Sequence, residues 1–220
     1  MNRIAAMQPY FLPFAGYFRL MCDVDVFVLL DDVQFRKGGW IHRNRLRTRT
    51  GDLSWLTLPL VKAPVTTLIR ELRFRDTARD EIKRSIRRFP AAEHPSPDAA
   101  GLIESVSNLE DRPLDLISRL LERASDILDL RVPMVRSSSL ELSAGPDRVE
   151  RLVALCRYFG ANTYLNAPGG RVLYDEAAFA RHGIDLQFLP DYRGPLDSIL
   201  QRLHETKPTA LRHEIVANLE

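Results

Sequence analysis

Two neighbouring carboxylates, Asp31 and Asp32, directly follow the apolar segment of residues 26–30. A short segment of β-branched and aromatic residues that ends in polar residues is typical of a buried strand. A carboxylate at a strand end could act as a general base, orient an amine or bind a divalent metal through water. Because neighbouring strand residues point to opposite faces, at most one of them should enter a site unless the strand has already ended. The alternative is that both are turn or cap residues.

The densest polar group in the chain follows Trp40 and consists of His42, Arg43, Asn44 and Arg45. The planar fork of arginine suits a carboxylate or a phosphate, and an imidazole titrates near neutral pH, as a proton carrier must. These residues predict a ligand site in which the arginines hold an anion and Asn44 orients the attacking group. The alternative is a solvated basic hairpin in which Arg43 pairs with one of the two aspartates.

Gln8 ends a first apolar segment, residues 4–7, and a helix is expected over residues 14–24 before the second apolar segment. A crossover of strand, helix and strand makes the two strands parallel. In open parallel sheets the ligand crevice lies at the carboxyl ends of the strands. We therefore expect Gln8, the aspartate pair and the arginine-asparagine loop to converge on one pocket.

The turn of residues 13–17 stands at the head of this expected helix. A small residue such as Gly16 could let a phosphate approach the helix N-terminus, as in nucleotidylyltransferases. In that class a histidine pair supports the phosphates, whereas this chain has Tyr17 where a histidine would be expected. The analogy is therefore one of architecture, and Gly16 could equally serve to pack the helix on its sheet.

A second loop, residues 166–170, follows a short expected strand and could present backbone N–H groups to an anion or an acyl oxygen. With Tyr174 nearby, Asn166 is a candidate for positioning a substrate, although the loop could also be a simple tight turn. Residues 134–136 predict another short strand, which runs into the hydroxyl-rich residues 137–139.

The whole chain predicts a single α/β domain over residues 1–220, with a mostly parallel, Rossmann-like sheet flanked by helices. An α/β part reaches to about residue 90, and a helical and mixed part with added C-terminal helices occupies residues 91–220. Helices are expected over about residues 97–107 and 112–128. The alternation of apolar and polar residues over 67–74 predicts a strand with one exposed face.

The composition, 45% hydrophobic and 27% charged residues, is ordinary for a soluble globular protein. No apolar segment approaches the roughly 20 residues of a membrane span. Gln8, Pro9 and Pro13 interrupt what would be the apolar region of a signal peptide, so a cytoplasmic protein is expected. A net charge of +2 argues against a general nucleic-acid binder. Six basic residues nevertheless lie close together, and they are Arg36, Lys37, Arg43, Arg45, Arg47 and Arg49.

The two cysteines, Cys22 and Cys156, form neither a disulfide framework nor a paired metal-ligand spacing. Cys22 could accept an acyl group only if a base activated it, and free cysteines are usually buried and inert. The remaining histidines show no ligand spacing, so no metal site is expected, and the sequence identifies no cofactor.

Several stretches resemble the WbqC-like proteins. They are MQPYFLPFAGYF (residues 7–18), DVFV (25–28), DDVQF (31–35), GWIHRNR (39–45), LPL (58–60), YLNAPGG (164–170), LY (173–174) and GIDL (183–186). The resemblance covers most of the chain, although residues 196–200 match the family pattern only in part. Such proteins look like products of O-antigen, other polysaccharide and natural-product gene clusters. The resemblance implies a glycine or amino-acyl transferase.

Together, the residues and the resemblance predict a transferase that attaches an acyl or amino-acyl group to an amine or hydroxyl of a nucleotide sugar or natural-product intermediate. The donor would be a small molecule or carrier-bound, and Asp31, Asp32 or His42 would remove the proton. The candidate substrate-binding residues are Gln8, Tyr10, Tyr17, Trp40, Arg43, Asn44, Arg45, Asn166 and Tyr174.

Two other functions stay open. One is an ATP-dependent adenylate-forming or nucleotidylyltransferase-like enzyme, with the turn of residues 13–17 against the phosphates. The other is a non-enzymatic nucleic-acid-binding or scaffold module that uses the basic loop. The sequence also leaves open whether the chain forms a homodimer.

Overall fold

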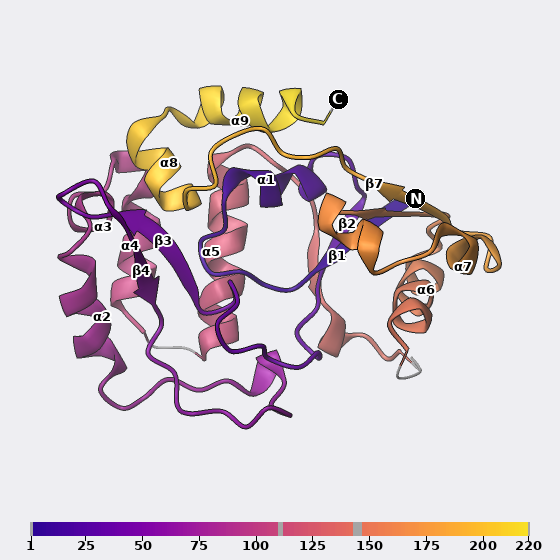
Figure 1. Ribbon diagram of the computed structural model, residues 1–220, viewed down its shortest axis with the longest axis horizontal. Helices are drawn as coiled ribbons and strands as arrows, with labels where there is room; N and C mark the ends of the chain where they lie inside the picture. The colour runs from indigo at the N-terminus through magenta and orange to yellow at the C-terminus, as the bar shows by residue number, and fades with distance from the viewer. Residues whose placement is uncertain (1, 110–111, 143–146, 220) are drawn as a thin grey trace.

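The central sheet of the computed structural model has five parallel strands in the order β5-β2-β1-β6-β7 (Figure 1). The structure describes residues 2–109, 112–142 and 147–219. The strands are β1 (Arg3–Met7), β2 (Val26–Leu29), β5 (Met134–Arg136), β6 (Thr163–Asn166) and β7 (Asp185–Phe188). Taken in chain order, they are arranged 3-2-1-4-5, as in the Rossmann order. The predicted parallel α/β sheet is therefore confirmed.

The first two strands lie side by side, as predicted. Ile4 pairs with Val26 and Met7 pairs with Leu29 in parallel register. The connection contains a short helix, α1 (Ala15–Phe18), that continues as the 3₁₀-helix η1 (Arg19–Met21). Both strands therefore end at the same edge of the sheet.

Helices cover both faces of the sheet, and the inner strands β1 and β2 consist mostly of apolar residues, as is typical of buried parallel strands. Alternate residues face opposite sides: Ala5 and Phe27 belong to the core on the side of α1 and α5, whereas Ile4 and Val28 belong to the core beneath α6 and α7 (Figure 1). These helices are α5 (Pro113–Ile127), α6 (Arg148–Phe159) and α7 (Glu176–Ala180).

A separate antiparallel hairpin, β3 (Arg43–Arg47) and β4 (Leu53–Thr57), lies away from the sheet. Helices from distant parts of the chain pack around it. α2 (Ala78–Ile86), α3 (Pro90–Glu93) and α8 (Ile199–Glu205) contact the hairpin, α4 (Pro97–Ser107) packs on α2 and α8, and α9 (Pro208–Ala217) packs on α8. The predicted helix over residues 97–107 is confirmed; it begins with a proline in its first turn, where no N–H is needed.

The beginning of α8 anchors the loop that follows β1. The hydroxyl of Ser198 donates to the carbonyl of Leu12 at 2.8 Å, and the N–H of Ile199 donates to the carbonyl of Pro13 at 2.7 Å. This loop includes Leu12 at a φ of 46°, a left-handed conformation that a leucine rarely adopts. Residues near the end of the chain thus hold the loop at its beginning.

The predicted strand over residues 67–74 is wrong. Its centre is the 3₁₀-helix η2 (Ile69–Glu71), and the carboxylate of Glu71 accepts the N–H of Leu68 at 2.9 Å, which closes the turn. The N–H of Arg70 donates to the carbonyl of Asp31 at 2.9 Å. The backbone of this segment therefore bonds to the loop after β2 and does not extend a sheet.

Among the helices of the described residues, none has both the length and the apolarity needed to cross a membrane.

Candidate functional site

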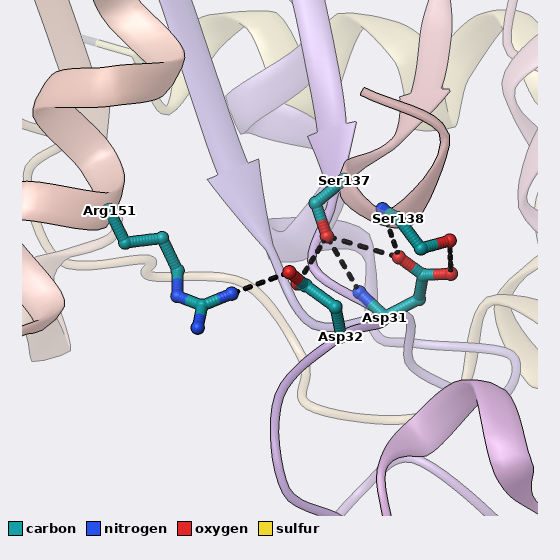
Figure 2. Close-up of polar contacts among 5 residues, drawn as sticks. All are labelled: Asp31, Asp32, Ser137, Ser138 and Arg151. Atoms are coloured by element: carbon teal, nitrogen blue, oxygen red, sulfur yellow. Dashed lines mark hydrogen bonds and ion pairs between the residues drawn. The ribbon is translucent and has the colours of Figure 1, made fainter. Parts of the chain in front are cut away.

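Asp31 lies at the carboxyl end of β2, opposite the serine-rich turn η3 (Ser137–Ser139) that follows β5 (Figure 2). Its side chain is fully buried. One carboxylate oxygen accepts the N–H of Ser138 at 2.9 Å, and the other accepts the hydroxyl of Ser138 at 2.5 Å. Because β2 and β5 pair in parallel, the residues that follow them leave the sheet at the same edge. The topology of the sheet therefore places this carboxylate against the serines.

A single hydroxyl connects the two aspartates. The Oγ of Ser137 lies 3.0 Å from Asp31 Oδ1 and 2.6 Å from Asp32 Oδ1, and it accepts the N–H of Asp31 at 3.2 Å. A serine hydroxyl has one proton, so it donates to one carboxylate at a time, and the shorter contact is to Asp32. The other oxygen of Asp32 accepts from Arg151 of α6 at 2.6 Å (Figure 2).

A cavity of about 530 Å³ opens beside Asp31. This volume falls within the range of about 300–1,000 Å³ that is usual for ligand pockets. Four arginines line the cavity: Arg70, Arg73, Arg112 and Arg136. The other lining residues are Asp31, Glu71, Leu114, Asp115 and Ser138.

Three of these arginines have no carboxylate partner among the described residues. Arg136 donates to Asp115 at 2.7 Å, so its charge is balanced within the protein. Arg70, Arg73 and Arg112 are exposed, and within residues 2–109, 112–142 and 147–219 none of them pairs with a carboxylate. Guanidinium groups in such a cluster suit phosphates or carboxylates, which they bind through paired hydrogen bonds.

A smaller cavity of about 220 Å³ adjoins the first. Arg70 and Ser138 line both cavities. Asp31 lines the larger cavity and Asp32 the smaller one. Because β2 has already ended at Leu29, the two neighbours each reach a cavity.

The guanidinium groups of Arg43 and Arg45 lie against tryptophan rings, and the ligand site predicted for them stays a prediction. Arg43 lies in β3, with its guanidinium 4.1 Å from the centre of the Trp55 ring, and it also donates to the carbonyl of Gly38. Arg45 lies 5.5 Å from the ring of Trp40 and 5.7 Å from that of Trp55. The alternative that Arg43 pairs with one of the aspartates is wrong, because Arg43 stacks on a tryptophan as a cation-π partner.

Two other basic residues of this stretch, Arg47 and Arg49, also have partners within the protein. Arg47 pairs with Asp197 at 3.1 Å, and Arg49 pairs with Glu93. The cluster seen in the sequence is therefore largely engaged in internal contacts, which weakens the argument for a nucleic-acid surface.

Asn44 is buried in β3, and its amide is engaged in holding the loop after β1. Its Nδ2 donates to the carbonyls of Phe11 at 3.2 Å and Leu12 at 2.7 Å. Both amide hydrogens are thus used by the backbone, and Asn44 lines neither cavity. Its predicted role in orienting an attacking group stays a prediction without a free donor to support it.

His42 packs its ring edge-on against Phe35, with ring centres 5.2 Å apart. Burial, together with the nearby charges of Arg43 and Lys37, lowers the pKa of His42 to about 4. The ring is therefore neutral at pH 7. Its Nδ1 is buried without a hydrogen-bond partner among the described residues. His42 lines neither cavity, so its role as a proton carrier stays a prediction.

The low pKa of His42 predicts a pH dependence of stability. Between its ordinary pKa of 6.5 and its folded pKa of about 4, the unfolded chain binds a proton that the folded protein does not. We expect the free energy of unfolding to fall as the pH is lowered through this window, and His42→Gln to reduce that fall. Urea unfolding at pH 7 and pH 5 measures both. The exposed His94, changed to Gln, is the control; an equal pH dependence in all three proteins would contradict the expectation.

The candidate site residues in the segment that follows β1 are packed against other parts of the protein. Tyr17 is buried and donates its hydroxyl to the backbone carbonyl of Gln8 at 2.9 Å, and burial raises the pKa of Tyr17 well above 10. The ring of Tyr10 packs on Tyr17, with centres 5.4 Å apart. A Cβ at Gly16 would overlap the rings of Phe14 and Tyr192. The need for glycine there is therefore explained by packing.

The candidates of the second loop also lie outside the linings of both cavities. Asn166 is buried, and its side-chain oxygen accepts the N–H of Ala167 at 2.8 Å. A Cβ at Gly170 would overlap the Asn166 side chain, so the glycine allows this turn. Tyr174 packs edge-on against Phe179, with ring centres 6.0 Å apart.

The predicted convergence on one pocket is thus only partly observed. The shared edge of the sheet is present, but of the twelve candidates only Asp31 and Asp32 line the two cavities.

The thiols are poor nucleophiles. Burial raises the pKa of Cys22 to about 11 and that of Cys156 to about 12, although nearby arginines oppose the shift at Cys22. Both thiols are therefore protonated near neutral pH.

The sequence of this chain matches a known family. The model of the WbqC-like protein family matches residues 8–195, which is most of the 220 residues. The chain belongs to the WbqC-like protein family. This WbqC-like protein is also similar to the uncharacterized protein Rv1507c of Mycobacterium tuberculosis, with 32% identity over 201 residues that cover 90% of this chain and 85% of the relative. No solved structure matches it. Both cavities lie within the matched region.

The arginines and serines that line the two cavities were not among the predicted site residues. The missed groups are Arg70, Arg73, Arg112, Arg136, Ser137, Ser138 and Arg151. One signal could have found part of the set: Arg136 and the three serines stand at the end of an expected strand, as Asp31 does.

Proposed function

We propose that this WbqC-like protein is a transferase that attaches an acyl or amino-acyl group to an amine or hydroxyl of a nucleotide sugar or a related intermediate. The observation that carries the proposal is the buried carboxylate of Asp31 beside an arginine-lined cavity at the carboxyl ends of β2 and β5. The resemblance to proteins of polysaccharide and natural-product gene clusters supports the same class of substrate.

In this proposal the arginines bind the phosphates of the substrate. Arg70, Arg73 and Arg112 together offer more positive charge than a single carboxylate requires, and a diphosphate matches them better. The volume of the cavity leaves room for a sugar beside the phosphates. The phosphates would hold the sugar in place so that its reacting group lies near Asp31.

Asp31 is the proposed general base. The Ser138 hydroxyl, 2.5 Å from Asp31 Oδ2, is an exposed group that lines the cavity, so this oxygen lies within reach of a hydroxyl there. A hydroxyl or amine of the acceptor that took the place of Ser138 could lose its proton to Asp31 as it attacks the acyl carbonyl. The proton would then pass to the leaving group or to solvent.

The adenylate-forming alternative loses the phosphate position that the sequence suggested for it, because the rings of Phe14 and Tyr192 pack at Gly16. It is tested by whether ATP with magnesium raises the melting temperature of the protein more than a nucleotide diphosphate does.

The anion site predicts a specific loss of binding. With uridine diphosphate as the probe, we expect Arg73→Ala to raise the Kd about tenfold or more, because one charged hydrogen-bonding group contributes roughly 1.5–3 kcal/mol. Isothermal titration calorimetry measures the Kd. Arg84, an exposed residue of α2 that does not line the cavity, supplies the control Arg84→Ala. Equal affinities in the three proteins would place the diphosphate elsewhere.

The activity itself is tested with an extract of cells that lack the gene, which supplies the native donor and acceptor. Addition of the purified protein should produce one new species, heavier than its precursor by an acyl or amino-acyl group, in mass spectra of the nucleotide-sugar pool. The absence of any such species in extracts that contain both partners would overturn the proposal.

A further inference from the structure

The lining of the smaller cavity differs from that of the larger cavity, which four arginines line. The smaller cavity's lining is mostly polar, and its apolar part comes from Leu140 and Leu142, with the core residue Leu155 at its border. The ion pair of Asp32 and Arg151 forms a charged part. Arg151 and Leu155 are four residues apart on one face of α6, where Arg151 is partly exposed and Leu155 is buried in the core.

The ion pair keeps binding capacity on both partners. The side chains of Arg151 and Asp32 are 26% and 25% exposed. A guanidinium has five N–H donors, and Arg151 uses one of them for Asp32. Each carboxylate oxygen can accept more than one hydrogen bond, and each oxygen of Asp32 accepts one. A ligand with both a cation and an anion could therefore bind beside the pair without separating it.

We infer that the smaller cavity is a second binding site, for an aliphatic α-amino acid whose ammonium meets Asp32, whose carboxylate meets Arg151 and whose side chain packs on the leucines. The volume of about 220 Å³ lies below the range of about 300–1,000 Å³ that is usual for drug-sized ligands. That is room for a molecule the size of valine or leucine and too little for a nucleotide.

This inference rests on the proposed function and deepens it, because the two cavities adjoin. Arg70 and Ser138 line both, so a ligand in each would meet close to the Asp31 carboxylate. A transferase needs two substrates held side by side. Because a free carboxylate has no leaving group, the amino acid would react as a carrier-bound thioester whose thiol leaves as the acceptor attacks, and the free amino acid of the test below reports recognition in this cavity. Leu140 and Leu142 distinguish the ligand from glycine, which has no side chain to pack against them.

The test uses matched probes on the full chain by isothermal titration calorimetry. L-Leucine carries all three recognised groups, isocaproate lacks the ammonium, isoamylamine lacks the carboxylate, and glycine lacks the side chain. We expect L-leucine to bind at least tenfold more tightly than each of the other three. A Kd for leucine no lower than that for glycine, or no binding of leucine at millimolar concentration, overturns the inference without any variant.

Two substitutions assign the charged groups. Arg151→Met should weaken L-leucine and isocaproate at least tenfold and leave isoamylamine unchanged, whereas Asp32→Asn should weaken L-leucine and isoamylamine and leave isocaproate unchanged. Arg157→Met is the control, since Arg157 lies on the same helix, is exposed and does not line the cavity. Thermal unfolding establishes that each variant is folded before it is titrated. Leucine binding that neither substitution weakens overturns the assignment to this cavity.

The result is separable from the proposed function. Failure of leucine to bind while uridine diphosphate still binds in a manner dependent on Arg73 overturns the amino-acid site alone. Leucine binding together with the absence of any acylated product in the extract supports this site and overturns the transferase.

Discussion

Replacement of Asp31 by asparagine is expected to lower the initial rate of product formation about 10²- to 10⁴-fold, the usual contribution of a general base. Asparagine has the shape of aspartate, and its carbonyl oxygen can still accept the N–H of Ser138, which Asp31 accepts at 2.9 Å. It has no basic oxygen to take a proton. The rate is measured from the accumulation of the acylated species in an extract of cells lacking the gene.

Two further variants test whether this loss of rate is specific to Asp31. Asp80, an exposed residue of α2, supplies the matched control Asp80→Asn, which should keep the full rate. Asp32→Asn should act on the Km for the substrate in the smaller cavity more than on kcat, because Asp32 holds that substrate in our proposal. A folded Asp31→Asn protein that retains more than a tenth of the rate would show that another group removes the proton.

Replacement of Asn44 by aspartate is expected to lower the free energy of unfolding by about 2–4 kcal/mol, since a carboxylate cannot donate to the carbonyls of Phe11 and Leu12. The same change places a negative charge in a buried position, which adds to the cost. Urea unfolding at pH 7 gives the value. Asn162→Asp, at an exposed position, is the control for the chemical change.

This experiment also decides between two roles for Asn44. If its amide serves the fold, the Kd of uridine diphosphate stays unchanged at a temperature where the variant is folded. If Asn44→Asp has ordinary stability and has lost a ligand, the sequence-based expectation that Asn44 orients a substrate is the right one.

Much of the fold could be predicted because its signals are local. Two short apolar segments with a helix between them imply parallel strands, and β1 and β2 pair in that way. The alternating residues 67–74 misled the prediction, because a segment that crosses the surface while its backbone bonds to another loop can show the same alternation. The alternation of apolar and polar residues indicates which side chains are buried, but it does not indicate where the backbone forms its hydrogen bonds.

The candidate site could be predicted only where one segment carries it. Asp31 stands at a strand end, which the sequence reveals. Arg70, Arg112 and Arg136 come from three distant segments: Arg70 is held against Asp31 by a backbone hydrogen bond, Arg112 precedes α5, and Arg136 ends β5, which pairs with β2. Arg43 and Arg45 were predicted instead, because basic residues lie close together around them in the sequence. Their partner Trp55 lies on the opposite strand of a hairpin, and the sequence gives no sign that it covers them.

The order in which the chain is synthesised differs from the order in which its sheet is assembled. β1 leaves the ribosome first. Its neighbour β6, which pairs with it at Arg3 and Thr163, is synthesised about 160 residues later. The loop after β1 is anchored by Ser198 and Ile199, which are synthesised later still. Contacts between such distant residues slow folding, because a long stretch of chain must be closed before they form. A growing chain therefore keeps one edge of its central strand unpaired until most of the protein has been made, and during that time it depends on protection from aggregation.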